Sequence, residues 1–466
     1  MDIFDDLEKY TSNTAIVTES SDQINYRVLL DAAGNIGEHI KQRSLVFLIC
    51  RNCFESIAGY LGFIRTKAVP VMINDSINNT FFLNLLEAYK PEYIFLPTEM
   101  SFLNFNFTSV FSYRSYTLLK TTYRIDYTLN NDLALLLTTS GSTGSPKLVR
   151  QSYKNIYNNA ESITQYLGIT SSDRPITTMP FSYSYGLSII NSHLLKGASI
   201  ILTNTSLMDR SFWEIFKGNN ATTFGGVPYI YEMLKKLRFE RMNLPSLKYI
   251  TQAGGRLSMK LSEEFADICV DKEIKFYVMY GQTEATARMS YLPWEYTHTK
   301  TGSIGIAIPG GKFWLEDENK NIIKKNNSIG ELVYQGDNVT MGYAKNCFDL
   351  QNDDENNGVL RTGDLAKMDS DGFYYIAGRM KRFLKLYGNR INLDEIEELI
   401  KTAGYDCVCA GNDNDLKIYV TEPDDGDRII SYIAKRTGIN KAGFSFVHID
   451  KIPRNDSGKV QYSALG

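Results

Sequence analysis

Residues 138–147 carry the strongest chemical signal in the chain. They read Thr-Thr-Ser-Gly-Ser-Thr-Gly-Ser-Pro-Lys, so every residue from Thr138 to Ser145 is Ser, Thr or Gly. Glycine lets successive backbone N–H groups turn toward one anion, and the hydroxyl groups add further donors. Lys147 adds a positive charge on a long side chain, which can contact the outer phosphates of a nucleotide. We therefore predict a phosphate-binding loop formed by Thr139, Ser140, Gly141, Ser142, Thr143, Gly144 and Lys147.

Two other interpretations of this loop are weaker. A Walker A loop needs Lys directly after its second Gly, whereas Gly144 is followed by Ser-Pro-Lys-Leu. A flexible Ser/Gly linker is not expected directly after an apolar run such as residues 133–137, nor directly before a Pro-Lys pair. The run favours a buried strand that leads into the loop.

The elements that must position this loop follow from hydrophobic periodicity. Apolar runs such as residues 44–50 alternate with stretches of helical period such as residues 53–65. This alternation predicts an α/β fold with βαβ units and two mostly parallel sheets. From about Gly302 onward, short strands separated by Gly and Asn predict a small β-barrel-like unit.

The chain is expected to divide into a large and a small domain. Beyond Arg379 the pattern changes to short helices and strands that predict a compact α+β segment. We therefore predict a large N-terminal domain over residues 1–380 and a small C-terminal domain over residues 381–466.

Composition excludes several classes of protein. The 466 residues are 43% hydrophobic and 22% charged, which is typical of a water-soluble globular protein with two or three packed units. The formal charge of -3 supplies no field that holds a polyanion, so nucleic acid is not an expected partner. The acidic N-terminus lacks the features of an export signal, and no apolar run approaches membrane-spanning length. We therefore expect a cytoplasmic protein without a membrane span.

The six cysteines are too sparse for a disulfide scaffold and are expected to be free thiols. Cys50-Arg-Asn-Cys53 has the CxxC spacing, and Cys407-Val-Cys409 could complete a zinc site. However, Cys50 ends an apolar run, which favours a buried strand residue over a metal ligand.

Residues 138–147 resemble the phosphate loop of the acyl-adenylate-forming superfamily of AMP-binding enzymes, which includes acyl-CoA synthetases, adenylation domains of peptide synthetases and luciferases. Other segments resemble further motifs of this family, in the family's order and along nearly the whole chain. The early matches, residues 24–30 and 62–75, are weak. The later matches are residues 280–285, 330–332 with 342–343, 361–364, 378–381 and 453–459.

The resemblance implies an ATP-dependent, Mg²⁺-requiring ligase. Its carboxylic acid substrate would attack the α-phosphorus of ATP, release pyrophosphate, and pass from acyl-AMP to the thiol of CoA or of a carrier-protein phosphopantetheine. Two anions must meet in the first step, so cations and hydrogen-bond donors have to surround the reacting centre. By resemblance, Lys459 contacts the substrate carboxylate and the α-phosphate, Thr283 hydrogen-bonds a phosphate, and Glu284 holds Mg²⁺.

The resemblance also implies the other nucleotide contacts. The ring of Tyr280 packs on adenine, and the carboxylate of Asp364 accepts hydrogen bonds from both ribose hydroxyls. Arg379 and Arg390 are expected to reach ribose and phosphate. The further expected contacts are Gly254, Gly255, Arg256, Gly281 and Gln282.

The acyl pocket is expected at Tyr183, Ser184, Gly225, Val227, Gly254 and Gly281. Amino-acid adenylation domains carry an Asp in the segment that matches residues 180–187, and this chain has none there. An α-amino acid would leave its ammonium group unpaired at a desolvated site, so a small carboxylic acid without that amine is the expected substrate. The alternatives are a stand-alone amino-acid adenylating enzyme and a non-catalytic ATP-binding scaffold.

In relatives the small domain rotates about the residue two after the arginine of the Gly-Arg pair, which is Lys381 here. The rotation removes the catalytic lysine and admits the acceptor thiol, so that one site runs two reactions. The segment around residues 407–416 is shorter than in many CoA ligases, which leaves CoA and a carrier protein open as acceptors.

Overall fold

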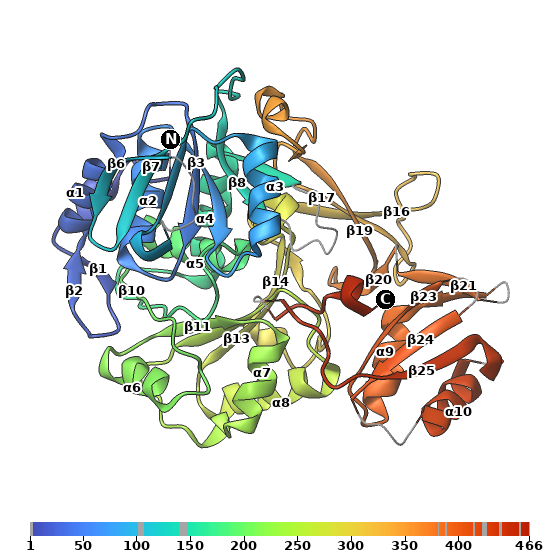
Figure 1. The fold of residues 1–466 in the computed structure, drawn as a ribbon. Coiled ribbons are helices and arrows are strands. Elements are labelled where there is room, and N and C mark those ends of the chain that lie inside the picture. The colour runs from blue at the N-terminus through green and yellow to red at the C-terminus, as the bar shows by residue number, and fades with distance from the viewer. Residues whose placement is uncertain are drawn as a thin grey trace.

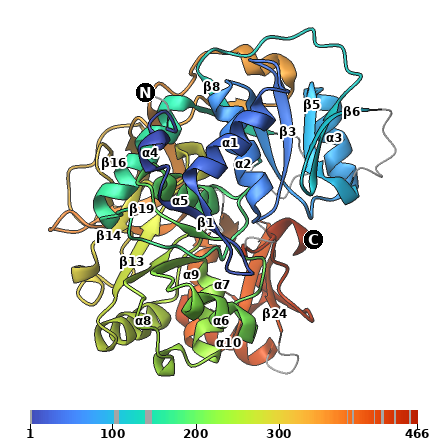
Figure 2. The same cartoon turned by 90° about the vertical axis from the view of Figure 1, so that its left-hand side faces the viewer.

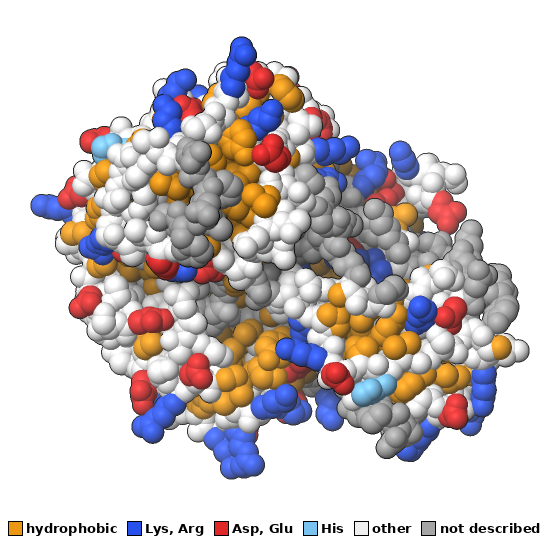
Figure 3. All heavy atoms as spheres, viewed as in Figure 1, with side chains coloured by type: hydrophobic (Ala, Val, Ile, Leu, Met, Phe, Trp, Pro, Cys, Tyr) orange, Lys and Arg blue, Asp and Glu red, His pale blue; other side chains and the backbone are white. Residues whose placement is uncertain are grey.

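The computed structural model describes residues 3–100, 107–138, 147–380, 382–386, 389–412, 415–421, 426–437, 440–455 and 458–465. None of the helices in these ranges is both long enough and apolar enough to cross a membrane. On the face drawn in Figure 3, basic and acidic side chains are interspersed.

The first sheet has a parallel centre and antiparallel edges. Strand β3 lies between β4 and β5 and is parallel to both, and β4 is parallel to β8. All six residues of β3 are buried, as expected for a strand with both faces covered. The sheet order is β18 (Tyr343–Ala344), β9 (Leu148–Ser152), β8 (Leu133–Thr138), β4 (Val69–Asn74), β3 (Leu45–Cys50), β5 (Tyr93–Pro97), β7 (Tyr116–Lys120) and β6 (Thr108–Tyr113).

Helices cover both faces of this sheet. Alternate residues of β3 belong to different hydrophobic clusters, because successive side chains of a strand point to opposite faces. Figure 2 shows α1 and α2 on one side of β3 and α3 on the other. The helices of this part are α1 (Tyr26–Gly37), α2 (Phe54–Arg65), α3 (Asn79–Tyr89), α4 (Tyr153–Leu167) and α5 (Ser184–Leu195).

The second sheet is also parallel at one end and antiparallel at the other. Its order is β11 (Thr223–Gly226), β12 (Tyr249–Gln252), β13 (Lys275–Tyr280), β14 (Ser290–Leu292) and β15 (Ile306–Ala307). It packs with the helices α6 (Arg210–Gly218), α7 (Pro228–Lys236) and α8 (Met259–Asp271). A small sheet of β10 (Ile200–Ile201), β1 (Thr14–Val17) and β2 (Gln23–Asn25) lies beside them.

The expected β-barrel-like unit is an open antiparallel sheet with the order β16 (Lys312–Glu316), β17 (Gly330–Gln335), β19 (Val359–Met368) and β20 (Tyr374–Arg379). The two sheets expected to be mostly parallel are mixed. Short connections explain this difference, because parallel neighbours need a crossover of a dozen or more residues. Residues 139–147 join β8 to β9 directly, and the two strands pair antiparallel.

The C-terminal elements form a group of their own, coloured orange to red in Figure 1. Strands β21 (Phe383–Leu386) and β22 (Asn389–Asn392) pair antiparallel. Strand β24 (Asp415–Val420) lies between β23 (Cys407–Asn412) and β25 (Phe444–His448). The helices α9 (Leu393–Thr402) and α10 (Gly426–Thr437) pack on these strands through a hydrophobic cluster.

Candidate active site

Asp364 is a buried carboxylate that three neighbouring side chains contact. Its side chain is 3% exposed, and the register of β19 and β20 places it opposite Arg379, whose Nε lies 3.0 Å from Oδ1. The hydroxyl of Tyr280 donates to Oδ2 at 2.5 Å, and Nε2 of Gln282 donates to the same atom at 2.9 Å. Burial and the Asp364 carboxylate raise the pKa of Tyr280, so its hydroxyl stays protonated and donates. These contacts fix the direction in which the carboxylate can accept a ligand's hydroxyl groups.

Glu284 lies in a short 3-10 helix, residues Thr283–Ala285, directly after β13. Its backbone oxygen accepts from the amide and the hydroxyl of Thr340 at 3.0 and 2.9 Å. The hydroxyl of Tyr343 donates to Oε1 at 2.5 Å. One carboxylate oxygen is therefore oriented by the protein, while Oε2 has no hydrogen-bond partner in the described ranges.

This arrangement fits Mg²⁺ bound together with a nucleotide. Magnesium usually takes one or two carboxylates and completes its octahedron with phosphate oxygens and water. Among the described residues no group of three or more His, Cys, Asp or Glu side chains could hold a metal by itself. Glu284 is thus the residue that would hold the ion, with phosphate oxygens as its other ligands.

Tyr343 is a site residue to which the sequence analysis gave no role. Its ring lies under Lys147, whose Nζ is 3.2 Å from the ring centroid, while its hydroxyl holds Glu284. The backbone of Tyr343 pairs with β9 and accepts a hydrogen bond from Nε of Arg150, a side chain that is 0% exposed. Tyr343 therefore positions both the carboxylate of Glu284 and the ammonium of Lys147, which are the expected metal-binding and phosphate-binding groups. The only sequence signal for it was the Gly-Tyr motif at residues 342–343.

Two substitutions of Tyr343 separate these contacts. Tyr343→Phe removes the hydrogen bond to Glu284 and keeps the ring under Lys147, so we expect the Mg²⁺ concentration for half-maximal adenylation to rise about 10–100-fold. Binding of ATP in the presence of EDTA should be unchanged in this variant and weaker in Tyr343→Leu, which loses the ring as well. Mg²⁺ titrations and equilibrium ATP binding measure the two effects. A normal Mg²⁺ requirement in Tyr343→Phe would contradict the assignment.

Lys459 lies in the C-terminal segment that reaches back toward β14 in Figure 1. A turn holds its backbone, because its amide donates to Oδ1 of Asn455 at 2.9 Å and its carbonyl accepts from the Asn455 amide at 2.8 Å. Gly458 has φ +74° and packs against Val227. The amine of Lys459 lies 5.3 Å from the ring centroid of Tyr183. The side chain is therefore directed into the expected site and not into solvent.

The charges around Lys459 set its protonation. Burial, together with the Arg379 guanidinium, lowers the pKa of the Lys459 ammonium to about 8, although the carboxylates of Glu284 and Asp364 act in the opposite direction. All three neighbours are predicted site residues, and they come from the 3-10 helix after β13, from β19 and from β20. The structure thus brings Lys459, Glu284, Asp364 and Arg379 together.

This lowered pKa predicts a pH dependence. The ammonium is charged below about pH 8 and neutral above it, so kcat/KM for adenylation should fall about tenfold per pH unit above pH 8. Bound phosphates stabilise the charged form, so the fall in kcat should begin at a higher pH. In Lys459→Arg, whose guanidinium stays charged, the fall near pH 8 should be absent. An unchanged profile in that variant would assign the titration to another group.

Most of the expected acyl-pocket residues also lie together. A Cβ built on Gly254 would lie 2.8 Å from the Tyr183 hydroxyl and 2.9 Å from Val227, and φ is +82° there, so only Gly fits. Oγ of Ser184 lies 3.3 Å from Oγ1 of Thr283, which links the expected acyl pocket to the residue expected to bind a phosphate. Gly225 lies next to the hydroxyl group of Tyr185, whereas Gly254 lies next to that of Tyr183.

The remaining predicted residues are placed differently. Gly281 packs so closely on the carbonyl of Ala287 that a Cβ would lie 1.8 Å from that oxygen. Gly255 and Arg256 are exposed to solvent. Outside the described residues are Thr139, Ser140, Gly141, Ser142, Thr143, Gly144, Lys381 and the side chain of Arg390, whose backbone lies in β22.

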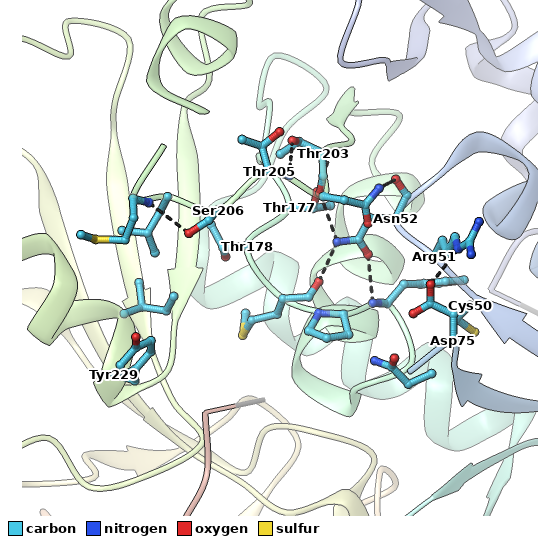
Figure 4. A pocket seen from close by; sticks show the side chains of 18 of the residues that line it. Cys50, Arg51, Asn52, Asp75, Thr177, Thr178, Thr203, Thr205, Ser206 and Tyr229 are labelled. Carbon is cyan, nitrogen blue, oxygen red and sulfur yellow. Dashed lines mark hydrogen bonds and ion pairs between the residues drawn. The ribbon is translucent and has the colours of Figure 1, made fainter. Parts of the chain in front are cut away.

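A cavity of about 280 Å³ lies next to the residues expected to line the acyl pocket. Figure 4 shows Thr and Asn side chains on one part of its wall and Tyr229 on another. Asn52 organises the polar part, since its amide nitrogen donates to Met179 at 3.1 Å and its amide oxygen accepts from the Phe181 amide at 3.1 Å. No local sequence pattern predicts this cavity, because its lining residues come from separate segments of the chain, among them the ends of β3 and β4 and the helix α7.

The family model described as AMP-binding enzyme matches residues 3–344. The chain is 27% identical over 346 residues to a 2-succinylbenzoate–CoA ligase of Bacillus licheniformis. The matched region covers 72% of this chain and 70% of the relative. It is 24% identical over 488 residues to a 2-succinylbenzoate–CoA ligase of Staphylococcus aureus, with 96% of each chain covered.

A solved structure has the same fold. The O-succinylbenzoate coenzyme A synthetase of Bacillus subtilis in complex with AMP superposes with a TM-score of 0.80 and 21% identity. The match covers 100% of this chain and 98% of that chain.

Proposed function

This protein belongs to the AMP-binding enzyme family, and from that premise we propose that it is an ATP-dependent ligase that joins a carboxylic acid to a thiol. In the first half-reaction the acid's carboxylate attacks the α-phosphorus of ATP, which gives acyl-AMP and pyrophosphate. In the second, the acceptor thiol attacks the acyl carbonyl, which gives a thioester and AMP.

The observation that carries this proposal is the convergence of Lys459, Glu284 and Asp364 from segments far apart in the sequence. An attack of one anion on another requires a cation at the meeting point, and the buried ammonium of Lys459 offsets the charge that builds up there. Asp364, held by Tyr280 and Gln282, offers its carboxylate to the ribose hydroxyls. Mg²⁺, when bound at Glu284, neutralises phosphate charge and so favours the departure of pyrophosphate.

Several features support CoA as the acceptor. The curated relatives named above are CoA ligases. The cavity beside Met179 combines amide and hydroxyl groups with the apolar side chains of Ile230 and Met233, which suits the amide-containing, flexible pantetheine arm. The same arm is attached to carrier proteins, so a carrier-protein phosphopantetheine is the second acceptor in this proposal.

The fold supports a finer division of the chain. We propose a large domain over residues 1–380 and a small, mobile domain over residues 381–466 that turns about Lys381. A separate hydrophobic cluster, made of residues between Leu384 and Phe446, supports the second unit. All six cysteines are free thiols, which suits the reducing conditions of the cytoplasm as the site of action.

ATP–pyrophosphate exchange across fatty, aryl, hydroxy, dicarboxylic and amino acids tests the function. We expect acid-dependent exchange that requires Mg²⁺, followed by thioester formation when CoA is added. Exchange only with α-amino acids would favour the amino-acid adenylating alternative. ATP binding without exchange for any acid would contradict the proposed ligase and favour a scaffold.

A further inference from the structure

Arg288 is a buried cation that the proposed mechanism does not use. It lies between the 3-10 helix of Glu284 and strand β14, and it is 2% exposed. Its Nε donates to Oγ of Ser188 at 3.1 Å, and its Nη1 donates to the hydroxyl of Tyr166 at 3.1 Å. The guanidinium also lies 5.1 Å from the ring centroid of Tyr185. Each of these partners is electrically neutral.

The absence of an anion distinguishes Arg288 from Arg150, which is also buried, and from Arg382, which is partly buried. Arg150 pairs with Glu355, and Arg382 pairs with Asp394 and Glu397. In the described ranges no carboxylate pairs with Arg288. A charged group without a counter-ion in an apolar interior is unfavourable, so buried charges are normally paired.

One edge of the guanidinium is left for a ligand. Nη2 has no hydrogen-bond partner among the described residues, yet it is not one of the fully enclosed, unpartnered polar atoms, which are Arg43 Nε, Gln151 Oε1, Tyr153 OH and Tyr231 OH. Part of the Nη2 surface is therefore accessible, and its two N–H groups can donate to an acceptor that reaches it.

Arg288 lies along the wall of the expected acyl pocket. Ser188 is one helical turn after Ser184 on α5. The ring of Tyr185 contacts both the Arg288 guanidinium, which lies 5.1 Å from its centroid, and the ring of Tyr183, whose centroid lies 6.5 Å away in an edge-to-face arrangement. The amine of Lys459 lies over Tyr183, so the reacting carboxyl belongs near Tyr183 and the far end of the acid near Tyr185.

We propose that Arg288 binds a second carboxylate at the far end of the substrate, so that the enzyme activates dicarboxylic acids. This inference rests on the proposed ligase function. The fit is chemical, because a guanidinium matches the planar geometry of a carboxylate and charge-assisted hydrogen bonds are the strong ones in a desolvated site. The substrate then supplies the anion that the protein itself does not place beside Arg288.

Matched pairs of acids test the inference. The pairs are an aliphatic or aryl dicarboxylic acid and its analogue of equal length whose far end is a methyl ester or a methyl group. In ATP–pyrophosphate exchange, the wild-type enzyme should favour each diacid over its neutral partner by on the order of 10²-fold or more in kcat/KM. Equal or better exchange with the neutral partners would overturn the role of Arg288 and leave the ligase intact. Failure of every acid would instead overturn the ligase.

Two variants locate the effect. Arg288→Met removes the charge at similar side-chain length and should abolish the preference for the diacid. We expect kcat/KM to fall for the diacid and to change little for its neutral partner. Arg288→Lys keeps the charge and should retain part of the preference. Thermal unfolding and ATP binding show whether each variant is folded. If Arg288→Met does not fold, the wild-type and Arg288→Lys ratios still decide the question. A folded Arg288→Met that keeps the wild-type preference would overturn the inference.

Discussion

Lys459→Ala is expected to lower the rate of adenylation by on the order of 10²–10³-fold, while thioester formation from pre-made acyl-adenylate survives. The ammonium is needed only while the carboxylate and the α-phosphate approach each other, and the thiol attack involves no such meeting of anions. ATP–pyrophosphate exchange measures the first half-reaction, and release of AMP from added acyl-adenylate and CoA measures the second.

A matched control lies in the same segment. Lys451 is exposed, so Lys451→Ala removes an equal charge from the C-terminal segment without emptying the site. This variant should show wild-type rates in both half-reactions. Lys459→Arg should recover part of the adenylation rate, because its charge is kept but its shape differs. Equal losses of both half-reactions in Lys459→Ala would refute the assigned role.

Lys381→Pro is expected to spare adenylation and block thioester formation. The residues on either side of Lys381 are anchored to different parts of the chain. The amide of Met380 donates to Gly363 of β19 at 2.8 Å, while the guanidinium of Arg382 pairs with Glu397 of α9 at 2.7 Å. If the small domain turns as proposed, we expect the backbone between these two residues to absorb the rotation. Proline fixes φ near −65° and opposes that rotation.

Lys381→Ala is the control for this prediction, because it removes the same side chain and leaves the backbone free. It should keep both half-reactions. The two rates are measured as for Lys459, and overall turnover is measured as CoA consumption. Wild-type turnover in Lys381→Pro would exclude a hinge at this position.

Local sequence patterns were sufficient to predict many of the helices and strands and to predict the family. The run at residues 44–50 corresponds to β3, and the helical stretch at 53–65 corresponds to α2. The family prediction is confirmed by the family model. These features could be predicted because strand and helix periods, and the Ser/Gly/Thr composition of residues 138–147, depend only on near neighbours in the chain. Neighbour patterns do not specify strand pairing, so the antiparallel edges of the sheets were not foreseen.

The charge state of the site was decided by the tertiary structure alone. Tyr343 meets Glu284 across 59 residues, and Tyr166 meets Arg288 across 122. Lys459 has a lowered pKa only because the folded chain buries it beside Arg379. Thus the sequence by itself determined which reactive groups the protein has and in what order. Which of them are buried, paired or left without a counter-ion depends on partners that only folding brings within a few ångströms, where desolvation and Coulomb forces act.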